Sequence, residues 1–469
     1  MASSTNVLRD GQWVSEAVNR GHAGLKARNV TDPTSASESA TQSCGILTKT
    51  IVDTPAVRWI LPARLRSKEH NDIAFIGDFF VHIYEMLDDG RLSHVAAKTN
   101  FPTRIRNAAV FGEDCSFQEV VHWIKTEEDD PMQDYGSSMP RLPPQMLVLS
   151  VAPGATVFLF MGSQTSREWT TIRYEGPKNN SSNLGYHMKI DPTMRYMVSA
   201  ASEGIFIVHE LESFANLRAQ YAQSRPLMPI KSTRARSIRG IIHRLDFLHP
   251  GPRDDQLVAL VLIVLGRHAP DESLVSRIIA FDWIAGDTNI FAKKPTYNFL
   301  PDDHKLPLLL IPLKLQMAVL LISQGCLGKV IDILSGIPNI TNQDATMRPP
   351  TSLHYGSSPP LWTAWARPVR RGEYWNTSDN IYLAREDGLV ALIEIKEDEG
   401  FVPDLADAGC VNNNVDTAFA TVYDKFSDVL LVGGTTGNGG IYKVSPSPVP
   451  FELGNSALRG RLANPSCNI

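Results

Sequence analysis

Two clusters of basic residues carry the strongest chemical signals in this sequence. The first, KSTRARSIRG at 231–240, contains Arg234, Arg236 and Arg239. A guanidinium group is always charged and is flat, so it binds phosphate and other anionic groups through several hydrogen bonds at once. These three arginines are therefore candidates for contact with nucleic acid or with a partner protein.

The second cluster, WARPVRRGEYW at 365–375, places arginines among aromatic residues. Its arginines are Arg367, Arg370 and Arg371, and the tryptophans in and beside it are Trp362, Trp365 and Trp375. Arginine beside aromatic rings binds phosphate and stacks on bases, which predicts a nucleic-acid contact. The alternative is that this segment is a loop whose tryptophans cap the core while its arginines are solvated. The formal net charge of −5 provides no global attraction for a polyanion.

Catalytic and metal-binding patterns are missing from the sequence. The glycine-rich run GGTTGNGG at 433–440 lacks the Lys-Ser/Thr that completes a phosphate-binding loop, so we interpret it as a turn between two strands. The sequence has no GxSxG or HExxH motif, and its five cysteines form no CxxC pair. Four adjacent carboxylates, at 127–130, indicate a solvated loop. We expect no enzyme activity, no metal, no cofactor and no small-molecule substrate.

The most apolar stretch, LPLLLIPLKLQMAVLLIS at 306–323, is long enough to raise the question of a membrane span. Lys314 near its middle, and Pro307 and Pro312 in its first half, argue against a span and against a single buried helix. Two strands with apolar side chains on both faces explain the run better, because a sheet covered on both sides needs such segments. We expect no membrane contact.

The ends of the chain differ in composition from its middle. Residues 1–45 are rich in Ser, Thr, Ala and Asn and predict a disordered tail, with no apolar signal peptide. Residues 46–450 predict one β domain, and 451–469 a C-terminal tail. Two polar, proline-containing stretches within the domain, 125–145 and 341–360, are interpreted as long surface loops.

Pairs of short apolar runs separated by turn residues recur along the domain. Each pair predicts a β-hairpin or a meander. The pairs lie at 71–87, 146–162, 186–211, 241–283, 306–323, 380–395 and 418–444. Helical periodicity is nearly absent, and its best candidate is 211–226. About seven such units predict a radial all-β architecture.

Several of these segments also resemble, in the same order, those of a known family. They are ILPARLRSKEHNDIAFIGDFFVHIYEM, KIDPTMRYMVSAASEGIFIVHEL, LDFLHP, LLLIPLKLQMAVLLIS, IYLAREDGLVALIEI and DVLLVGGTTGNGGIYKV. The family includes the large subunit of the damage-specific DNA-binding complex, the cleavage-and-polyadenylation specificity factor A subunit, the related splicing-factor subunit and the fungal methyl-methanesulfonate-sensitivity scaffold. The chain resembles the N-terminal propeller of these proteins over about residues 46–445.

This resemblance implies a seven-bladed, WD40-like β-propeller that acts as a scaffold without an active site. It implies a nuclear location, with a cytoplasmic pool as an option, and partners that are protein subunits of a larger complex. Family members carry two further propellers and a helical domain beyond this point, so we expect the surfaces that need those domains to be missing from this chain.

Three functional hypotheses remain at this stage. The preferred one is a non-enzymatic scaffold in DNA repair, of the cullin-ligase type, or in mRNA 3′-end processing or splicing. The second is direct nucleic-acid binding through the arginine and aromatic loop. The third is an enzyme whose polar residues converge at the central channel of the propeller, which a sequence cannot show.

Overall fold

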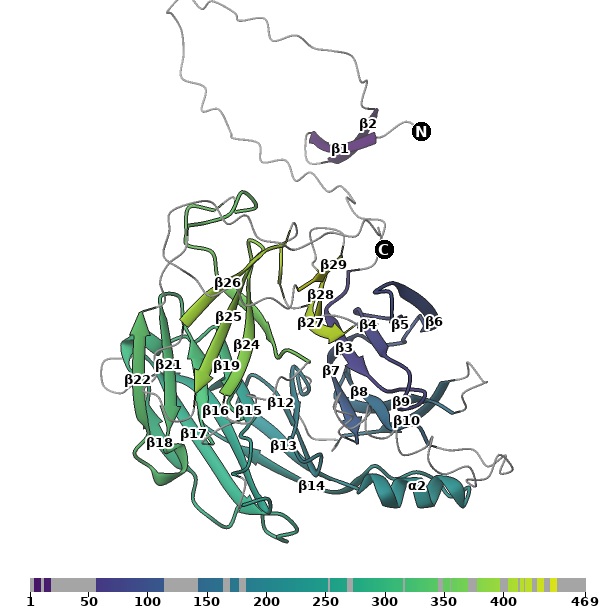
Figure 1. Cartoon of the computed structure of the whole chain (residues 1–469), viewed down its shortest axis with the longest axis vertical. Helices are drawn as coiled ribbons and strands as arrows, with labels where there is room; N and C mark the ends of the chain where they lie inside the picture. The colour runs from purple at the N-terminus through teal and green to yellow at the C-terminus, as the bar shows by residue number, and fades with distance from the viewer. Residues whose placement is uncertain are drawn as a thin grey trace, which may run out of the picture. The chain divides into compact units, whose positions relative to one another are not determined.

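The structure of this chain is a computed structural model (Figure 1). It describes residues 4–9, 12–17, 56–113, 142–162, 169–176, 183–251, 254–267, 273–314, 317–344, 349–354, 356–369, 378–396, 404–411, 414–416, 418–423, 428–433 and 439–444. The chain divides into two units, Met1–Pro55 and Ala56–Ile469.

The first unit overlaps the predicted tail, 1–45. Its described residues, β1 (Ser4–Arg9) and β2 (Gln12–Ala17), pair as an antiparallel hairpin. The predicted C-terminal tail, 451–469, lies outside the described residues.

The described residues of the second unit form six four-stranded antiparallel sheets and one three-stranded sheet, each built from strands that follow one another along the chain. We number these sheets as blades 1 to 7. The strands are β3 (Trp59–Ala63), β4 (Asp72–Ile76), β5 (Val81–Met86) and β6 (Leu92–Lys98) in blade 1; β7 (Ile105–Gly112), β8 (Gln145–Val151), β9 (Ala155–Met161) and β10 (Trp169–Tyr174) in blade 2; β11 (His187–Ile190), β12 (Tyr196–Ala200), β13 (Ile205–Leu211) and β14 (Ile230–Ser237) in blade 3; β15 (Ile241–Phe247), β16 (Leu257–Arg267), β17 (Leu274–Ile284) and β18 (Thr296–Phe299) in blade 4; β19 (Leu309–Pro312), β20 (Val319–Ile322), β21 (Cys326–Ile331) and β22 (Asn339–Asp344) in blade 5; β23 (Trp362–Ala366), β24 (Ser378–Arg385), β25 (Leu389–Lys396) and β26 (Asp404–Cys410) in blade 6; and β27 (Ala418–Tyr423), β28 (Asp428–Gly433) and β29 (Gly440–Lys443) in blade 7.

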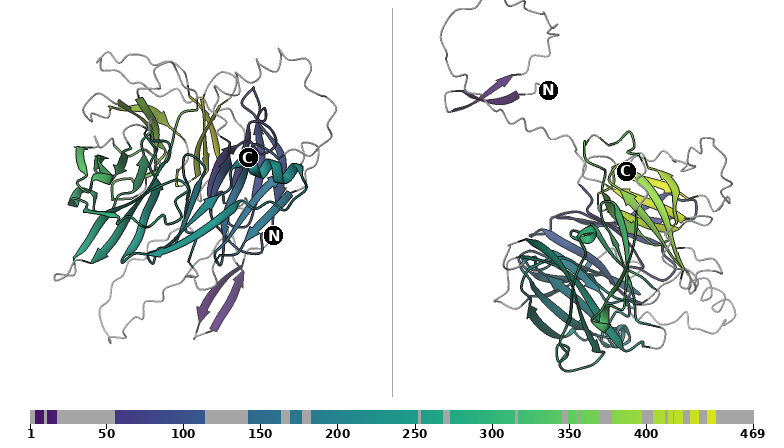
Figure 2. Two further views of the ribbon diagram at one scale, coloured as in Figure 1. Left: turned by 90° about the horizontal axis from the view of Figure 1, so that it is seen from below. Right: turned by 90° about the vertical axis from the view of Figure 1, so that its left-hand side faces the viewer.

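The first strands of the seven blades form a closed ring. Each of these inner strands contacts the inner strand of the next blade, and β27 of blade 7 contacts β3 of blade 1. Figure 2 shows the blades from two further directions. The predicted fold class, a seven-bladed all-β propeller, is confirmed.

Alternate side chains of each middle strand point to opposite faces of the blade and pack in two different apolar clusters. In β16, Leu260 and Leu262 pack in the cluster between blades 3 and 4, whereas Val261 and Ile263 pack in the cluster between blades 4 and 5. Seven such clusters occur, one between each pair of neighbouring blades. Because both faces of a blade are covered, its middle strands need continuous apolar runs rather than alternating ones.

The apolar stretch at 306–323 follows this rule. It forms β19 and β20, which pair as an antiparallel hairpin, so the prediction of two strands is confirmed. Leu321 packs toward blade 4 and Leu320 toward blade 6. Within the described part of the chain, no helix is long and apolar enough to cross a membrane.

Blades 7 and 1 close the ring through side chains. Ile60 and Phe75 of blade 1 share a cluster with Leu431 of blade 7. At the edge of this cluster Asn71 Nδ2 donates a hydrogen bond of 2.8 Å to the carbonyl oxygen of Tyr423, and the Arg64 guanidinium donates to the Tyr423 hydroxyl. The two ends of the propeller are therefore held by the same kind of apolar packing as any other pair of blades.

Two segments differ in detail from the predictions. The predicted loop at 341–360 begins inside β22, which is a strand as far as Asp344. The predicted helix at 211–226 is present as the shorter α2 (Phe214–Ala222), and the Ser213 hydroxyl caps it by accepting a hydrogen bond of 3.3 Å from the Asn216 N–H.

Candidate functional site

Two arginines of the first predicted cluster, Arg234 and Arg236, lie on β14, the outer strand of blade 3, and Arg239 follows it. Arg234 pairs in register with Val208 of β13, and Arg236 pairs with Phe206. Val208 and Phe206 both belong to the core between blades 3 and 4. Since paired residues of neighbouring strands project from the same face, both arginines point toward blade 4.

Arg236 lies against two aromatic rings of blade 4. Its Cζ is 5.1 Å from the ring centroid of Phe281 and 5.0 Å from that of Phe291, and its Nη1 donates to the Phe291 carbonyl oxygen at 3.4 Å. Arg234 is exposed and contacts carbonyl oxygens, those of Thr233 at 3.1 Å and of Thr288 at 3.4 Å. Stacking and carbonyl contacts orient both guanidinium groups but leave their charge unneutralised.

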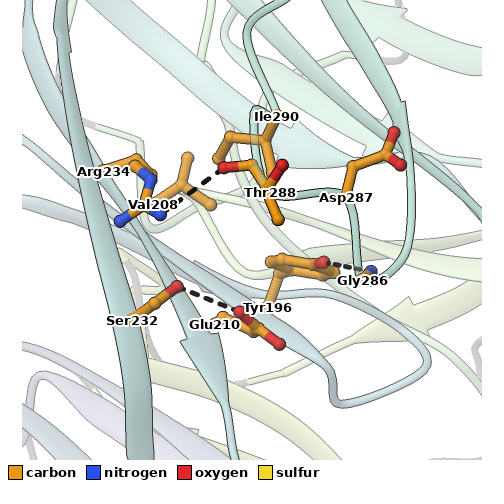
Figure 3. Close-up of a pocket in the computed structure, with 9 residues that line it drawn as sticks. All are labelled: Tyr196, Val208, Glu210, Ser232, Arg234, Gly286, Asp287, Thr288 and Ile290. Carbon is orange, nitrogen blue, oxygen red and sulfur yellow. Dashed lines mark hydrogen bonds between the residues drawn. The ribbon is translucent and has the colours of Figure 1, made fainter.

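A small pocket lies at the start of β14, where Arg234 shares the lining with the acidic side chains of Glu210 and Asp287 (Figure 3). The Gly286 N–H, in the β17–β18 loop of blade 4, donates to the Tyr196 hydroxyl at 2.9 Å, and Ser232 donates to Glu210 at 3.0 Å. The pocket volume of about 120 Å³ is enough for a few water molecules. The first of these bonds holds the blade 4 loop in place beside Arg234, and the second lies within blade 3.

A fourth arginine, on blade 4 and facing these residues of blade 3, was not predicted from the sequence. Arg277 of β17 pairs in register with Phe299 of β18, and its Cζ is 5.6 Å from the centroid of that ring. Arg277 stands two residues from Ile279, which packs in the core between blades 3 and 4, so it points toward blade 3. Arg277 is half-buried, and its buried Nε has no hydrogen-bond partner among the described residues. The available signal was a lone charged residue inside the apolar run LVSRIIAFDW.

Arg239 belongs to the same surface through the backbone around it. It is exposed and precedes Gly240, whose positive φ of 128° brings the chain close to blade 4. A Cβ at Gly240 would lie 2.5 Å from the Leu265 carbonyl oxygen and 2.6 Å from Val264. Since Val264 pairs in register with Arg277, Arg239 lies at the same end of blade 4 as Arg277.

We call this region the blade 3–4 arginine surface. Its members are Arg234, Arg236, Arg239 and Arg277, with the aromatic residues Phe291, Tyr297 and Phe299. Tyr297 and Phe299 are 55% and 60% exposed. Among the described residues none of the four arginines forms an ion pair with a carboxylate. The surface is therefore a local concentration of positive charge and aromatic area on an acidic protein.

Comparison with known families agrees with this fold. The model of the RSE1/DDB1/CPSF1 first β-propeller matches residues 56–467. The chain belongs to this family. A search of the curated proteins found no match. The resemblance noticed in the sequence is thereby confirmed, and the match begins where the second compact unit begins, at Ala56.

The second predicted cluster occupies a different part of this RSE1/DDB1/CPSF1-type propeller. Trp365 lies on β23, the inner strand of blade 6, and Arg367 follows it. Arg367 binds both carboxylate oxygens of Asp379, at 2.8 and 2.9 Å, and donates to the Pro312 carbonyl oxygen of blade 5 at 2.6 Å. The Asp379 side chain is only 2% exposed. Arg367 is therefore engaged in joining blades 5 and 6.

The buried charge of Asp379 is maintained by this contact. Burial alone would raise the pKa of the Asp379 carboxyl, but the hydrogen bonds and charge of Arg367 outweigh it and hold the pKa below its ordinary value. Trp362 and Trp365 pack against the core between blades 5 and 6 from a strand, not from a loop. Arg370 and Arg371 lie outside the described residues, and their contact with nucleic acid or a partner stays a prediction.

Other groups that could do chemistry have structural partners. His304 Nδ1 lies 2.7 Å from the Ser323 hydroxyl, and its Nε2 lies 3.1 Å from Asn342 Oδ1 and 3.6 Å from the Cys326 sulfur. In the described ranges, no three His, Cys, Asp or Glu side chains are placed to hold a metal ion. The described ends of the glycine-rich run at 433–440 belong to β28 and β29, in agreement with a turn between strands.

Proposed function

We propose that this chain is a non-enzymatic scaffold that presents its propeller to protein subunits of a larger nuclear assembly. The membership in the RSE1/DDB1/CPSF1 family supports a scaffold propeller of such complexes. The assembly would act in DNA repair of the cullin-ligase type, in mRNA 3′-end processing or in splicing.

The observation that carries this proposal is the closed ring itself. Seven apolar clusters join neighbouring blades, including blade 7 to blade 1. A ring without a free end holds its loops and outer strands at fixed positions, and binding segments placed on a rigid framework lose little entropy on association. Such a molecule can hold several partners at once in a defined arrangement.

Affinity purification of the tagged full chain from its native cell, followed by mass spectrometry, tests the proposal. We expect recovery of one coherent set: a cullin with ligase components, polyadenylation factors or splicing factors. Microscopy of the same tagged chain should place it mainly in the nucleus. Purification of the chain alone at physiological salt, or a mainly cytoplasmic signal, would contradict the proposal.

A further inference from the structure

We propose that the blade 3–4 arginine surface binds an extended acidic segment of a partner protein, which adds to β14 as a fifth strand of blade 3. This inference rests on the proposed scaffold function, because it specifies which surface receives a partner and what chemistry the partner segment has. It concerns the rim of the propeller, away from the inner ring.

The charge of the surface favours an anionic occupant. Arg234, Arg236, Arg239 and Arg277 have no carboxylate partner among the described residues, whereas Arg367 is matched to a buried aspartate. Arg234 and Arg236 contact only carbonyl oxygens and aromatic rings, and these neighbours leave donor groups available. Carboxylates arriving from outside would supply the missing charge-assisted hydrogen bonds.

The position of β14 favours an extended chain. It is the last strand of its sheet, and β13 is its one partner among the described strands, so its other edge can pair with an added strand. One carbonyl of β14, that of Thr233, already accepts a hydrogen bond from Arg234. Lys231, Arg234, Ala235 and Ser237 are all exposed along it. The result would be a main-chain ladder on the rim of blade 3.

The side-chain spacing defines the sequence of the bound segment. Arg234 and Arg236 are two residues apart on one face of β14, about 7 Å along the strand. Residues paired across an added strand would project from the same face, toward blade 4. Asp or Glu at every second position of the segment would therefore meet both arginines, and the partly exposed rings of Tyr297 and Phe299 would lie beside them on blade 4.

A nucleic acid fits these observations less well than an acidic peptide. Binding to a nucleic-acid backbone draws its affinity from the number of phosphates neutralised, and this surface offers four arginines on a chain with a net charge of −5. The Arg236 guanidinium already stacks on Phe281 and Phe291, so those rings do not offer a free face to a base. A short acidic peptide matches both the number and the spacing of the arginines.

Fluorescence anisotropy with the full chain tests this inference. The probe is a labelled ten-residue peptide of alternating Glu and Val, and the reference probes are the same peptide with Gln for Glu, an N-methylated version of the acidic peptide and a single-stranded RNA of ten nucleotides. We expect the acidic peptide to bind and its affinity to fall as NaCl is added. The Gln and N-methylated peptides should bind at least tenfold more weakly.

Charge reversal at two exposed positions locates the site. We expect the double substitution Arg234→Glu, Arg239→Glu to lower the affinity for the acidic peptide at least tenfold. A matched variant, Arg91→Glu with Lys396→Glu, changes the net charge equally at exposed positions on blades 1 and 6 and should bind as the wild type does. Thermal unfolding of both variants verifies that they are folded.

Three results would overturn the inference: no binding of the acidic peptide by the wild type, equal weakening by the two variants, or tighter binding of the RNA with competition for the same arginines. Purification of the Arg234→Glu, Arg239→Glu variant from cells separates this inference from the proposed function. Unchanged recovery of all partners would reject the surface and leave the scaffold, whereas peptide binding without any recovered partner would reject the scaffold and leave the surface.

Discussion

Arg236 and Arg367 both stack on aromatic rings, yet only Arg367 meets a carboxylate. The sequence marked both as members of clusters of arginine and aromatic residues, but it did not show which one has a partner. Asp379 follows Arg367 by twelve positions and reaches it only because β23 and β24 pair in the same blade. Local patterns predict where cations gather, and tertiary contacts decide which cations are neutralised.

Replacing Arg367 with alanine should strongly destabilise the propeller. Asp379 would remain buried without its partner, and breaking a buried ion pair on one side costs about 3–5 kcal/mol. Urea denaturation should show this loss. Arg91→Ala, which removes an exposed partner of Asp89, serves as the control and should leave the stability nearly unchanged, because an exposed ion pair is screened by solvent. Equal effects of the two variants would contradict the conclusion that Arg367 stabilises the contact between blades 5 and 6.

The same contact predicts a change in acid stability. The lowered pKa of Asp379 means that its contribution to stability is present above the ordinary aspartate pKa, about 3.9, and is lost as the pH falls through the folded-state value. Without Arg367, burial would raise that pKa. Acid unfolding of Arg367→Ala, followed by circular dichroism, should therefore begin at a higher pH than in the wild type.

At the scale of elements, the sequence predicted the middle strands far better than the outer ones. Middle strands such as β16 and β20 are buried on both faces and show continuous apolar runs. Outer strands such as β14 and β22 have one free edge and one partner, so polar residues are tolerated there. For that reason KSTRARS was recognised as a basic cluster but not as a strand, and the start of β22 was interpreted as a loop.

Only part of the blade 3–4 arginine surface could be predicted from the sequence, because its residues come from several strands. Arg234, Arg236 and Arg239 are close in sequence, whereas Arg277 and Phe299 come from two further strands. Their meeting depends on the packing of blade 4 against blade 3, which no local pattern contains. A radial arrangement brings the outer strands of consecutive blades together, so surfaces of this kind require the fold before the residues can be assigned.

A buried histidine in blade 3 should make the stability of the protein fall in mild acid. Burial lowers the pKa of His209 on β13 to about 4 from its ordinary 6.5. Between these values the unfolded chain binds a proton that the folded chain does not, so the stability that His209 contributes is full above pH 6.5 and falls as the pH drops toward 4, by about 3 kcal/mol for this one group. His187 on β11, whose pKa burial also lowers to about 4, adds to the same slope. Urea titrations at several pH values should show this slope.

The His209→Gln variant isolates this contribution. His209 Nδ1 lies 3.1 Å from the Thr233 hydroxyl, and Gln can keep a polar contact there without titrating. The variant can be less stable at neutral pH, so the informative quantity is the change in the urea midpoint between pH 6.5 and 4. We expect a smaller change than in the wild type. An unchanged slope would show that His209 is not the titrating group.

At the scale of the whole molecule, the ring closes between segments at opposite ends of the domain. Blade 1 begins at Trp59 and blade 7 ends at Lys443, yet β3 contacts β27. Bringing such distant segments together carries a loop-closure cost that grows only slowly with chain length. The apolar cluster of Ile60, Phe75 and Leu431 offsets this cost by packing blade 7 against blade 1.

Two neighbouring leucines on β28 test the closure directly. Leu430 faces blade 6 and Leu431 faces blade 1, and both are fully buried. Leu430→Ala removes packing between blades adjacent in the chain, whereas Leu431→Ala removes packing at the seam that closes the ring. Each substitution should cost about 2–5 kcal/mol, because each leaves a cavity in a packed core.

The comparison between these two variants is informative even if unfolding involves more than two states. In a closed ring both should lower the urea midpoint by a similar amount, and both should weaken hydrogen-exchange protection in blade 1 as well as in blade 6. If the seam opened in solution, Leu431→Ala would leave the midpoint almost unchanged while Leu430→Ala still lowered it. A closed ring is what lets a partner segment bound on the rim of blade 3 hold a fixed position relative to partners on every other blade.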